Sequence, residues 1–315
     1  MVQPGSLARV RRGGALALLI ACGEGCTGAS AGRTPTPPPS PLFIEAAPQR
    51  YSAELFSALR SLAVEVDIGP DARLWVRMHE ADNFATACRL LGQLHHELAF
   101  VDLSWLPISD FGPIFQLRSV ERLDLRGTAM VDLRLLRHLG ALRVLSLAET
   151  DIDSLTPLAE LRTLESLDLS DARVDLRDLA AMASLRELDL STARTTPRGF
   201  EVRDGEGLDL EGLRPLESLE SLRLTATKVH DWRPLRRLST LRRLELSYTN
   251  FQDPALLSDY ADLEALDLRR TAIADPWPLL ELDSLRFLDL RDCELLDPRD
   301  VQAFAALRRD VQILY

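Results

Sequence analysis

The chain has 315 residues, 46% of them hydrophobic, and a formal net charge of −11. This length allows one or two folded domains. The excess of acidic residues argues against nucleic-acid binding, which depends on Lys and Arg side chains that neutralise phosphates. Four cysteines in a chain of this length do not make a disulfide-stabilised scaffold.

The first residues are typical of an export signal. Arg9, Arg11 and Arg12 form a basic patch, and residues 13–21 are small or apolar. This apolar run is too short to cross a bilayer, which takes about 20 residues in a helix. The segment therefore predicts a signal peptide at residues 1–21, and a misassigned start codon is the alternative.

Residues 19–22 read LIAC, which resembles the lipobox of bacterial lipoproteins. The resemblance implies cleavage before Cys22 and acylation of this cysteine, which would attach the chain to a lipid bilayer through several acyl chains. Gly23 stands where an Asp would favour the inner membrane, so the resemblance favours the outer membrane of the cell envelope, in either leaflet. The alternative is an ordinary cleaved signal.

Residues 22–50 are rich in Pro, Gly, Ser and Thr. A segment of this composition cannot bury a core and is predicted to be a disordered tether. It would hold a folded domain away from a membrane, and a leader without a role is the alternative.

Residues 51–97 are predicted to form an N-terminal α/β cap, because the open end of a repeat stack has to be covered. Apolar spacing predicts helices over residues 52–62 and 82–95, with two alternating strands between them. Cys88 falls on the apolar face of the second helix, and we expect it to be a buried free thiol.

From residue 98 to residue 306 the frame L-x-x-L-x-L recurs nine times, mostly every 22 residues. The nine frames begin at Leu98, Val120, Leu142, Leu164, Leu185, Leu219, Leu241, Leu263 and Leu285. Such a period predicts an α/β solenoid of leucine-rich repeats, with short strands on the concave face and short helical or 3₁₀ turns on the convex face. Residues 307–315 are predicted to be a C-terminal capping strand.

Positions within a repeat are numbered here from the first residue of the frame. Positions 4 and 6 are predicted to point into the core and positions 3, 5, 7 and 8 to face outward, because strand side chains alternate. Position 9 turns the chain and holds Thr in five repeats. We expect Thr to bond weakly to the turn backbone, and the Ala or Cys of other repeats to do so hardly at all.

The second half of each repeat carries a signal for the start of a short helix. Asp, followed in some repeats by Pro, precedes an apolar turn, as at a helix N-cap and first position. The candidate caps are Asp132, Asp231, Asp253, Asp275 and Asp297. The whole pattern resembles the 22-residue repeats of bacterial internalin-like proteins, which implies recognition of a protein without naming the partner.

Position 5 is acidic in seven of the nine repeats. These residues are Asp102, Asp124, Asp168, Asp189, Glu245, Asp267 and Asp289. One interpretation is a ladder of charge for binding. The other is an inherited feature of the repeat, with arginines of neighbouring strands pairing diagonally.

The centre of the concave face gives a sharper hypothesis. The outward positions of the third to fifth repeats hold Glu149, Asp168, Asp171, Glu187 and Asp189 and no Arg. The remaining outward residues there are short. We therefore predict an unpaired acidic patch that binds an extended, basic segment of a protein or peptide.

The regular spacing breaks beside this patch, where the fifth repeat contains an insertion at residues 195–207. Insertions in repeat proteins often lie on the binding face, so Arg198 and Phe200 are further candidates for partner contact. A loop without a role is the alternative. Four aromatic residues are also predicted to face outward, either as anchors for a partner or as isolated surface aromatics: Phe100, Trp105, Tyr248 and Phe287.

Nothing in the sequence predicts catalysis. It contains no HExxH, no Cys-x-x-Cys and no phosphate-binding glycine loop. The string GASAG at residues 28–32 lies in the tether, without the strand and helix that a nucleophile elbow needs. The acidic column lies on a flat surface, which does not suit Ca²⁺.

The sequence thus predicts a non-enzymatic, lipid-anchored protein-binding module, without cofactor, metal, small-molecule substrate or nucleic acid. Two alternatives remain open at this stage. One is a structural scaffold of the envelope that binds through its convex side, at Trp232 or Trp277. The other is a cytosolic interaction regulator, if residues 1–21 are not a signal.

Overall fold

The computed structural model describes residues 52–70, 72–152, 154–195 and 207–315. By its contacts the chain divides into two units, Met1–Leu42 and Phe43–Tyr315, and every described residue lies in the second. The expected signal peptide, Cys22, the tether, Arg198 and Phe200 lie outside the described residues. Within those ranges no helix has the length and apolar character that crossing a membrane requires.

The N-terminal end of the folded unit is a small α/β layer. Helix α1 (Ala53–Ser61) leads into an antiparallel hairpin of β1 (Val64–Ile68) and β2 (Leu74–Met78), and α2 (Phe84–Leu91) follows. A 3₁₀ helix, η1 (Gly92–Glu97), connects α2 to the first repeat. Cys88 on α2 is fully buried, and burial raises the pKa of its thiol to about 12, so it is an inert core residue as predicted.

Each repeat then contributes one short strand to a single sheet of twelve strands, in the order β1-β2-β3-β4-β5-β6-β8-β11-β13-β14-β15-β16. All pairs after the first hairpin are parallel, and position 4 of one repeat lies opposite position 4 of the next, as with Leu145 and Leu167. The nine repeat strands are β3 (Leu98–Asp102), β4 (Arg122–Asp124), β5 (Val144–Ser146), β6 (Ser166–Asp168), β8 (Glu187–Asp189), β11 (Ser221–Arg223), β13 (Arg243–Glu245), β14 (Ala265–Asp267) and β15 (Phe287–Asp289), and β16 (Gln312–Leu314) follows them at the C-terminal edge of the sheet.

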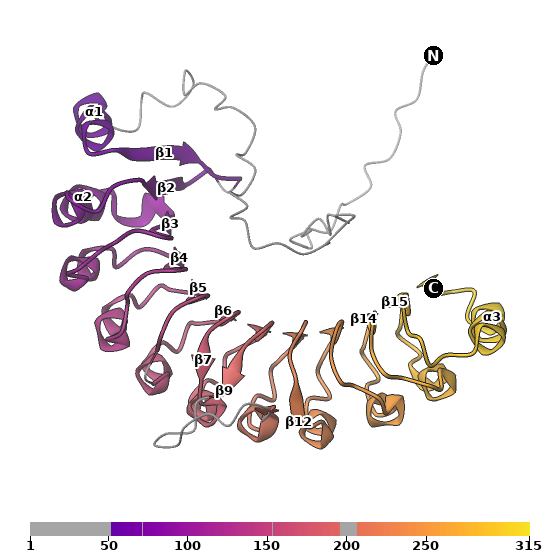
Figure 1. Cartoon of the computed structure of the whole chain (residues 1–315). Helices are drawn as coiled ribbons and strands as arrows, with labels where there is room; N and C mark the ends of the chain where they lie inside the picture. The colour runs from indigo at the N-terminus through magenta and orange to yellow at the C-terminus, as the bar shows by residue number, and fades with distance from the viewer. Residues whose placement is uncertain (1–51, 71, 153, 196–206) are drawn as a thin grey trace, which may run out of the picture. The chain divides into compact units, whose positions relative to one another are not determined.

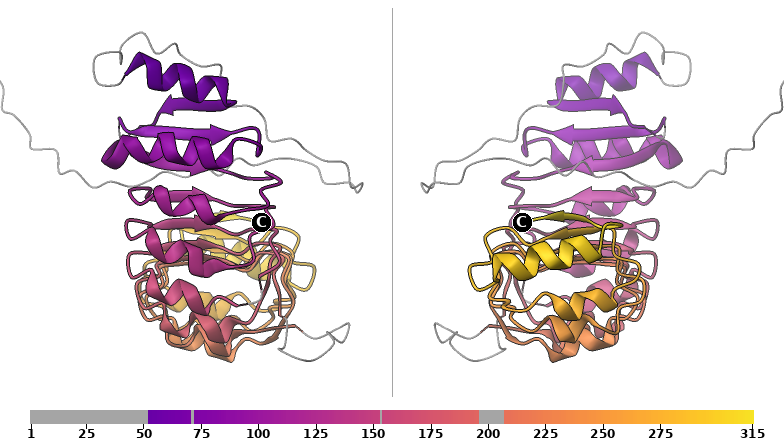
Figure 2. Two further views of the ribbon diagram at one scale, coloured as in Figure 1. Left: turned by 90° about the vertical axis from the view of Figure 1, so that its left-hand side faces the viewer. Right: turned by 90° about the vertical axis from the view of Figure 1, so that its right-hand side faces the viewer.

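The return path of each repeat is a single 3₁₀ turn, which suits a segment of four to six residues. These turns are η2 (Gly112–Gln116), η3 (Leu133–His138), η4 (Thr156–Glu160), η5 (Leu176–Ala181), η6 (Leu210–Leu213), η7 (Arg233–Arg237), η8 (Pro254–Leu257) and η9 (Trp277–Glu281), and the α-helix α3 (Pro298–Leu307) closes the ninth repeat. Within the folded unit the strands line the inner side of the curve and the helical turns its outer side (Figure 1). The side views in Figure 2 show the strands stacked across the sheet. The predicted solenoid is confirmed.

Two small ladders lie away from the main sheet. Strand β7 (Arg173–Val174) pairs in parallel with β9 (Arg194–Thr195), and β10 (Leu208–Asp209) pairs in parallel with β12 (Val229–Asp231). Strands β9 and β10 lie on either side of the insertion of the fifth repeat, whose residues 196–206 are outside the described ranges.

The core is a ribbon of leucines. Leu145, Leu167 and Leu222 at position 4 are each at most 1% exposed. A buried Leu contributes roughly 1.5–3 kcal/mol relative to an exposed one. Since every repeat supplies three such residues, the core does not depend on what the concave surface carries.

The five predicted N-cap aspartates all accept a backbone N–H two residues ahead, as Asp132 does from Arg134 and Asp297 from Arg299. Asp175 and Asp209, which the sequence pattern did not single out, make the same bond. These bonds satisfy donors that the first turn of a helix leaves without a partner.

The turn after each strand needs a left-handed residue. Position 8 has a φ between +55° and +62° in all nine repeats, and only one of these residues is glycine, Gly127. At position 9 a Thr hydroxyl donates to the strand carbonyl at position 6, as from Thr128 to Leu125 at 2.7 Å. The expectation that Cys would not bond here was wrong, because Sγ of Cys293 lies 3.1 Å from the Leu268 carbonyl oxygen of the preceding repeat.

Candidate functional site

The acidic ladder at position 5 has a structural cause. In each of the six repeats that carry Asp there, Oδ1 accepts the backbone N–H of position 7, at 2.9–3.1 Å. The carboxylate therefore satisfies a donor at the end of the strand, as short polar side chains do in turns. This favours the interpretation that the ladder as a whole belongs to the repeat and not to a partner.

The ladder positions are electrostatically unequal. Burial raises the pKa of Asp102, but hydrogen bonds from Ser104 and Arg77 outweigh burial and hold that pKa below its ordinary value. Burial raises the pKa of Asp124 and of Asp267, and neighbouring carboxylates raise both further. A raised pKa means that the folded chain disfavours the charged form of the carboxyl group. The charge of these two residues therefore does not stabilise the fold, and their role in accepting the turn N–H is structural.

The prediction of an unpaired acidic patch was wrong for its position-5 members. Nη2 of Arg126 lies 3.2 Å from Oδ2 of Asp168, and Nη1 of Arg223 lies 3.4 Å from Oδ2 of Asp189. Asp168 also accepts a hydrogen bond from Ser146. Both arginines belong to repeats that flank the patch, so reading the third to fifth repeats alone could not find them.

Glu187 at position 3 is paired as well, although its partner lies two repeats away. Nη2 of Arg243 reaches Oε1 of Glu187 at 3.1 Å and passes Ser221 of the intervening strand. Neighbouring strands are about 4.8 Å apart, so an Arg reaches across a strand only where that strand carries a short side chain. The strands that Arg126 and Arg243 cross carry Ser146, one of the short residues of the predicted patch, and Ser221 of the sixth repeat.

Two members of the patch remain. Glu149 and Asp171 occupy position 8 of adjacent repeats, are exposed, and have no side-chain hydrogen bond or ion pair among the residues that the structure describes. Their left-handed backbone places them at the end of the strands, beyond the position-5 ladder. Two carboxylates on neighbouring strands repel by roughly 1 kcal/mol in water at about 4–5 Å, which a cationic group between them would relieve.

The exposed aromatic residues flank these carboxylates in the same column. Trp105 is 60% exposed and its ring lies against Gly127, so closely that a Cβ on Gly127 would stand 2.3 Å from the ring. Tyr248 is 45% exposed and lies 5.3 Å and 5.4 Å from the guanidinium carbons of Arg269 and Arg270. Position 8 therefore runs from Trp105 through two carboxylates to Tyr248.

The other aromatic candidates are less available. Phe100 is half-buried in an edge-to-face contact with Trp75, at 5.4 Å between ring centroids. Trp232, named for a convex docking surface, is only 8% exposed and packs edge-to-face on Phe251 at 5.1 Å. A substitution at Trp232 would thus test the core and not a docking surface.

The sequence interpretation missed a second charged column. Position 2 alternates in sign through eight repeats, in the order Glu121, Arg143, Glu165, Arg186, Glu220, Arg242, Glu264, Arg286. Residues of adjacent repeats in this column form ion pairs, namely Arg143 with Glu165, Arg186 with Glu220, and Arg242 with Glu264. The alternation was readable from the sequence, in the residue directly after the first of each frame, and it is structural because each charge has an opposite neighbour.

Metal chemistry has no support in the ranges that the structure covers, where no group of three or more His, Cys, Asp or Glu side chains is placed to hold an ion. The two free carboxylates come from one flat edge. Such an arrangement can bind a cationic side chain, but it offers too few oxygens for Ca²⁺.

Solved structures of other proteins share this fold. An internalin of Listeria monocytogenes, InlF, matches over 82% of this chain and 68% of its own length, at 22% identity and a TM-score of 0.59. Internalin C2 of the same species matches over 67% and 90%, at 23% identity and a TM-score of 0.52. A leucine-rich-repeat protein of Leptospira interrogans matches over 72% and 62%, at 20% identity and a TM-score of 0.54.

No protein-family model matches the chain, and no curated protein sequence does. At these identities the structural likeness establishes the fold and nothing finer. The chain therefore has the leucine-rich-repeat solenoid fold that these structures share.

Proposed function

We propose that the chain is a protein-binding module that holds an extended, basic segment of a partner along position 8 of its concave face. The observation that carries the proposal is the pair Glu149 and Asp171, which stay exposed and unpaired while the other acids of the patch are neutralised. Trp105 and Tyr248 flank the pair and supply exposed aromatic surface of the kind that dominates binding energy.

An extended segment suits the geometry better than a bulky domain. The six steps from Trp105 to Tyr248 at about 4.8 Å each span roughly 29 Å across the strands, from repeat to repeat. An extended chain covers this with about nine residues at 3.3 Å each. A Lys or Arg near its middle would lie between Glu149 and Asp171, with apolar groups against the two aromatics.

We further propose that Cys22 is acylated and attaches the module to the bacterial cell envelope, at the outer membrane. The support is the sequence LIAC at residues 19–22, preceded by a basic patch and an apolar run. The test is fractionation of cells that express the wild-type chain or Cys22→Ala. We expect the wild type in the membrane fraction with incorporated labelled palmitate, and the variant without label; an unlabelled wild type contradicts the anchor.

Binding is tested by fluorescence anisotropy with labelled deca-lysine as the probe and deca-glutamate as the comparison. We expect deca-lysine to bind and deca-glutamate not to bind. Exposed charges are screened beyond about 10 Å at 0.1 M salt, so binding should weaken as salt is added. The double variant Glu149→Gln/Asp171→Asn should weaken binding about tenfold, a loss near 1.4 kcal/mol.

The matched control removes two acids from the convex side, Glu160→Gln/Glu281→Gln, and should leave binding within about twofold. Equal losses in both double variants would mean that net charge alone attracts the probe, and the concave site would be rejected. If the chain is instead a structural scaffold of the envelope, the concave and the convex double variant should bind envelope components equally well.

A further inference from the structure

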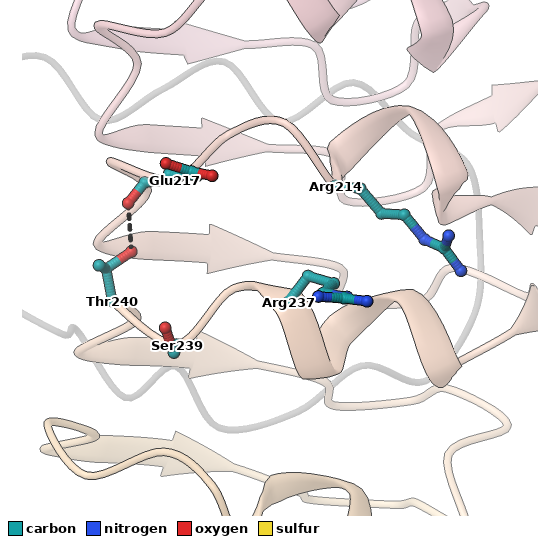
Figure 3. Close-up of a pocket in the computed structure, with 5 residues that line it drawn as sticks. All are labelled: Arg214, Glu217, Arg237, Ser239 and Thr240. Carbon is teal, nitrogen blue, oxygen red and sulfur yellow. Dashed lines mark hydrogen bonds between the residues drawn. The ribbon is translucent and has the colours of Figure 1, made fainter.

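A polar hollow lies outside the sheet, between the fifth and sixth repeats (Figure 3). It has a volume of about 570 Å³ and is lined by Arg214, Glu217, Arg237, Ser239 and Thr240. Its walls are the ends of η6 and η7 and the turns that lead from them to β11 and β13. This volume lies in the range of small-ligand sites, about 300–1,000 Å³.

One side of the hollow is cationic. Figure 3 shows the side chains of Arg214 and Arg237 on its helical side. Nε of Arg214 lies 2.8 Å from a carboxylate oxygen of Glu211, which fixes that guanidinium and leaves its other N–H groups available. Arg237 is exposed and has no ion pair within the described ranges, although the chain carries a net charge of −11.

The opposite side of the hollow is acidic and hydroxylated. The hydroxyl of Thr240 donates to the backbone carbonyl oxygens of Glu217 at 3.0 Å and of Leu219 at 2.8 Å, which fixes this wall. The carboxylate of Glu217 is exposed and has no ion-pair partner among the residues described. Glu217 and Arg237 therefore line one hollow with opposite charges and do not pair with each other.

This combination is confined to one place in the stack. Arg214 lies five residues before the frame that follows it. The third and fourth repeats carry Ala159 and Ala180 at the same place. Glu217 lies two residues before the frame that follows it, where the second repeat carries Gly140. The regular repeat thus does not require either charge.

We propose that the hollow binds a zwitterionic group made of a phosphoryl anion and a primary ammonium a few bonds away, as in phosphoethanolamine. Guanidinium groups match phosphate oxygens with several N–H donors, so Arg214 and Arg237 would hold the phosphoryl end. Glu217 would accept from the ammonium, with Ser239 beside it. The ligand thereby supplies a partner for Arg237 and for Glu217, the two charges of the hollow that have no ion pair within the described ranges.

The test uses the full chain in isothermal titration with phosphoethanolamine, phosphocholine, inorganic phosphate and ethanolamine. We expect millimolar binding of phosphoethanolamine, about tenfold tighter than that of each comparison compound. Phosphocholine has no N–H group for Glu217, and inorganic phosphate has no cation. Equal binding of inorganic phosphate would indicate a plain anion site and overturn the proposal, as would no binding of phosphoethanolamine.

Variants locate the site. Arg237→Glu should abolish binding, and Glu217→Gln should remove the preference for phosphoethanolamine over phosphocholine. Arg137→Glu is the control, because Arg137 has the place of Arg214 in the second repeat, where Gly140 replaces Glu217. A thermal melt checks that each variant is folded, and unchanged binding by folded Arg237→Glu would also overturn the proposal.

The source of the ligand is decided with vesicles. Flotation is compared between wild type and Arg237→Glu, on vesicles of phosphatidylethanolamine and of phosphatidylcholine, so that any contribution of an acyl anchor cancels. A difference on phosphatidylethanolamine alone identifies a lipid headgroup. Binding of free phosphoethanolamine without such a difference identifies a soluble ligand. Neither result bears on the concave site, which lies on the other side of the repeats.

Discussion

The third to fifth repeats and the seventh to ninth repeats have the same core and different concave surfaces. In the seventh to ninth repeats the arginines meet acids or aromatic rings, as Arg291 meets Asp289 and Arg270 lies near both Asp292 and Tyr248. In the third to fifth repeats two carboxylates, Glu149 and Asp171, meet no cation within the described residues. The difference lies entirely in the outward side chains.

On this surface an arginine can neutralise an acidic side chain as far as two repeats away. Arg126 and Arg243 reach acids two repeats away, because the strand between carries short residues. The acids they reach are at positions 3 and 5. Position 8 turns away from the sheet through its left-handed backbone, so its acids lie outside this reach. Asp292 meets Arg270 at the same position of the adjacent repeat, whereas the position-8 residues on either side of Glu149 and Asp171 are Gly127 and Thr192, so these two acids remain available to a partner.

The largest expected effect tests whether the two regions share one core. Leu167→Ala in the fourth repeat and Leu266→Ala in the eighth should each lower the free energy of unfolding by about 2–5 kcal/mol, because both leucines are at most 1% exposed. Urea unfolding followed by circular dichroism measures both. A loss in one variant and none in the other would show that the two regions do not pack alike.

The next prediction separates two rungs of the acidic ladder. Asp102→Asn should cost about 1–3 kcal/mol, because Arg77 and Ser104 lose a charged acceptor. Asp124→Asn should cost little or be stabilising, because the amide oxygen still accepts from Arg126 and a carboxylate with a raised pKa is no longer buried. Equal losses at neutral pH would contradict this assignment.

The two rungs also differ in the sign of their pH dependence. The pKa of Asp102 is lowered by folding, so its contribution is present above the pKa of the unfolded chain and is lost as the pH falls through the folded pKa. The pKa of Asp124 is raised, so its contribution is present below the unfolded pKa and is lost as the pH rises through the folded pKa. Unfolding measured from pH 3 to pH 7 should show Asp102→Asn flattening the acid side of the profile.

A smaller effect separates stability from binding at position 8. Glu149 holds a φ of +55°, a backbone region that costs a side chain roughly 1–2 kcal/mol and that glycine adopts freely. Glu149→Gly should therefore be as stable as the wild type or up to about 1 kcal/mol more stable, while binding deca-lysine more weakly. Ala226→Gly, at the same position two repeats beyond Asp171, removes no charge, so it is the control and should leave binding unchanged. A loss of stability in Glu149→Gly would mean that its side chain supports the fold.

The smallest expected change in stability sharpens the comparison between the regions. Arg243→Ala removes the exposed partner of Glu187, a pair of the kind that contributes about 0–1 kcal/mol. It also frees the carboxylate of Glu187 on the same concave face, so deca-lysine should bind a few-fold more tightly. Unchanged binding would show that Glu187 lies outside the surface the probe contacts.

Much of the molecule could be predicted from the sequence because the signals repeat. The frame of leucines predicted the solenoid, and Asp before each helical turn predicted the caps, as Asp132 and Asp253 show. The acids of the patch were also identified in the sequence. Arginines pairing diagonally with the ladder were one alternative, but the sequence could not decide which arginine meets which acid, since Arg126 is 42 residues from Asp168 and Arg243 is 56 residues from Glu187.

The sequence by itself determined the fold, because a leucine every few residues, repeated nine times, can be buried only by stacking each repeat on the next. It also determined which residue types lie on the concave face. Only the tertiary structure decided which of those charges remain free, because neutralisation depends on the reach of a side chain across neighbouring strands and on the direction in which position 8 leaves the sheet. Both depend on how neighbouring repeats are placed in space, which the order of residues along the chain does not give.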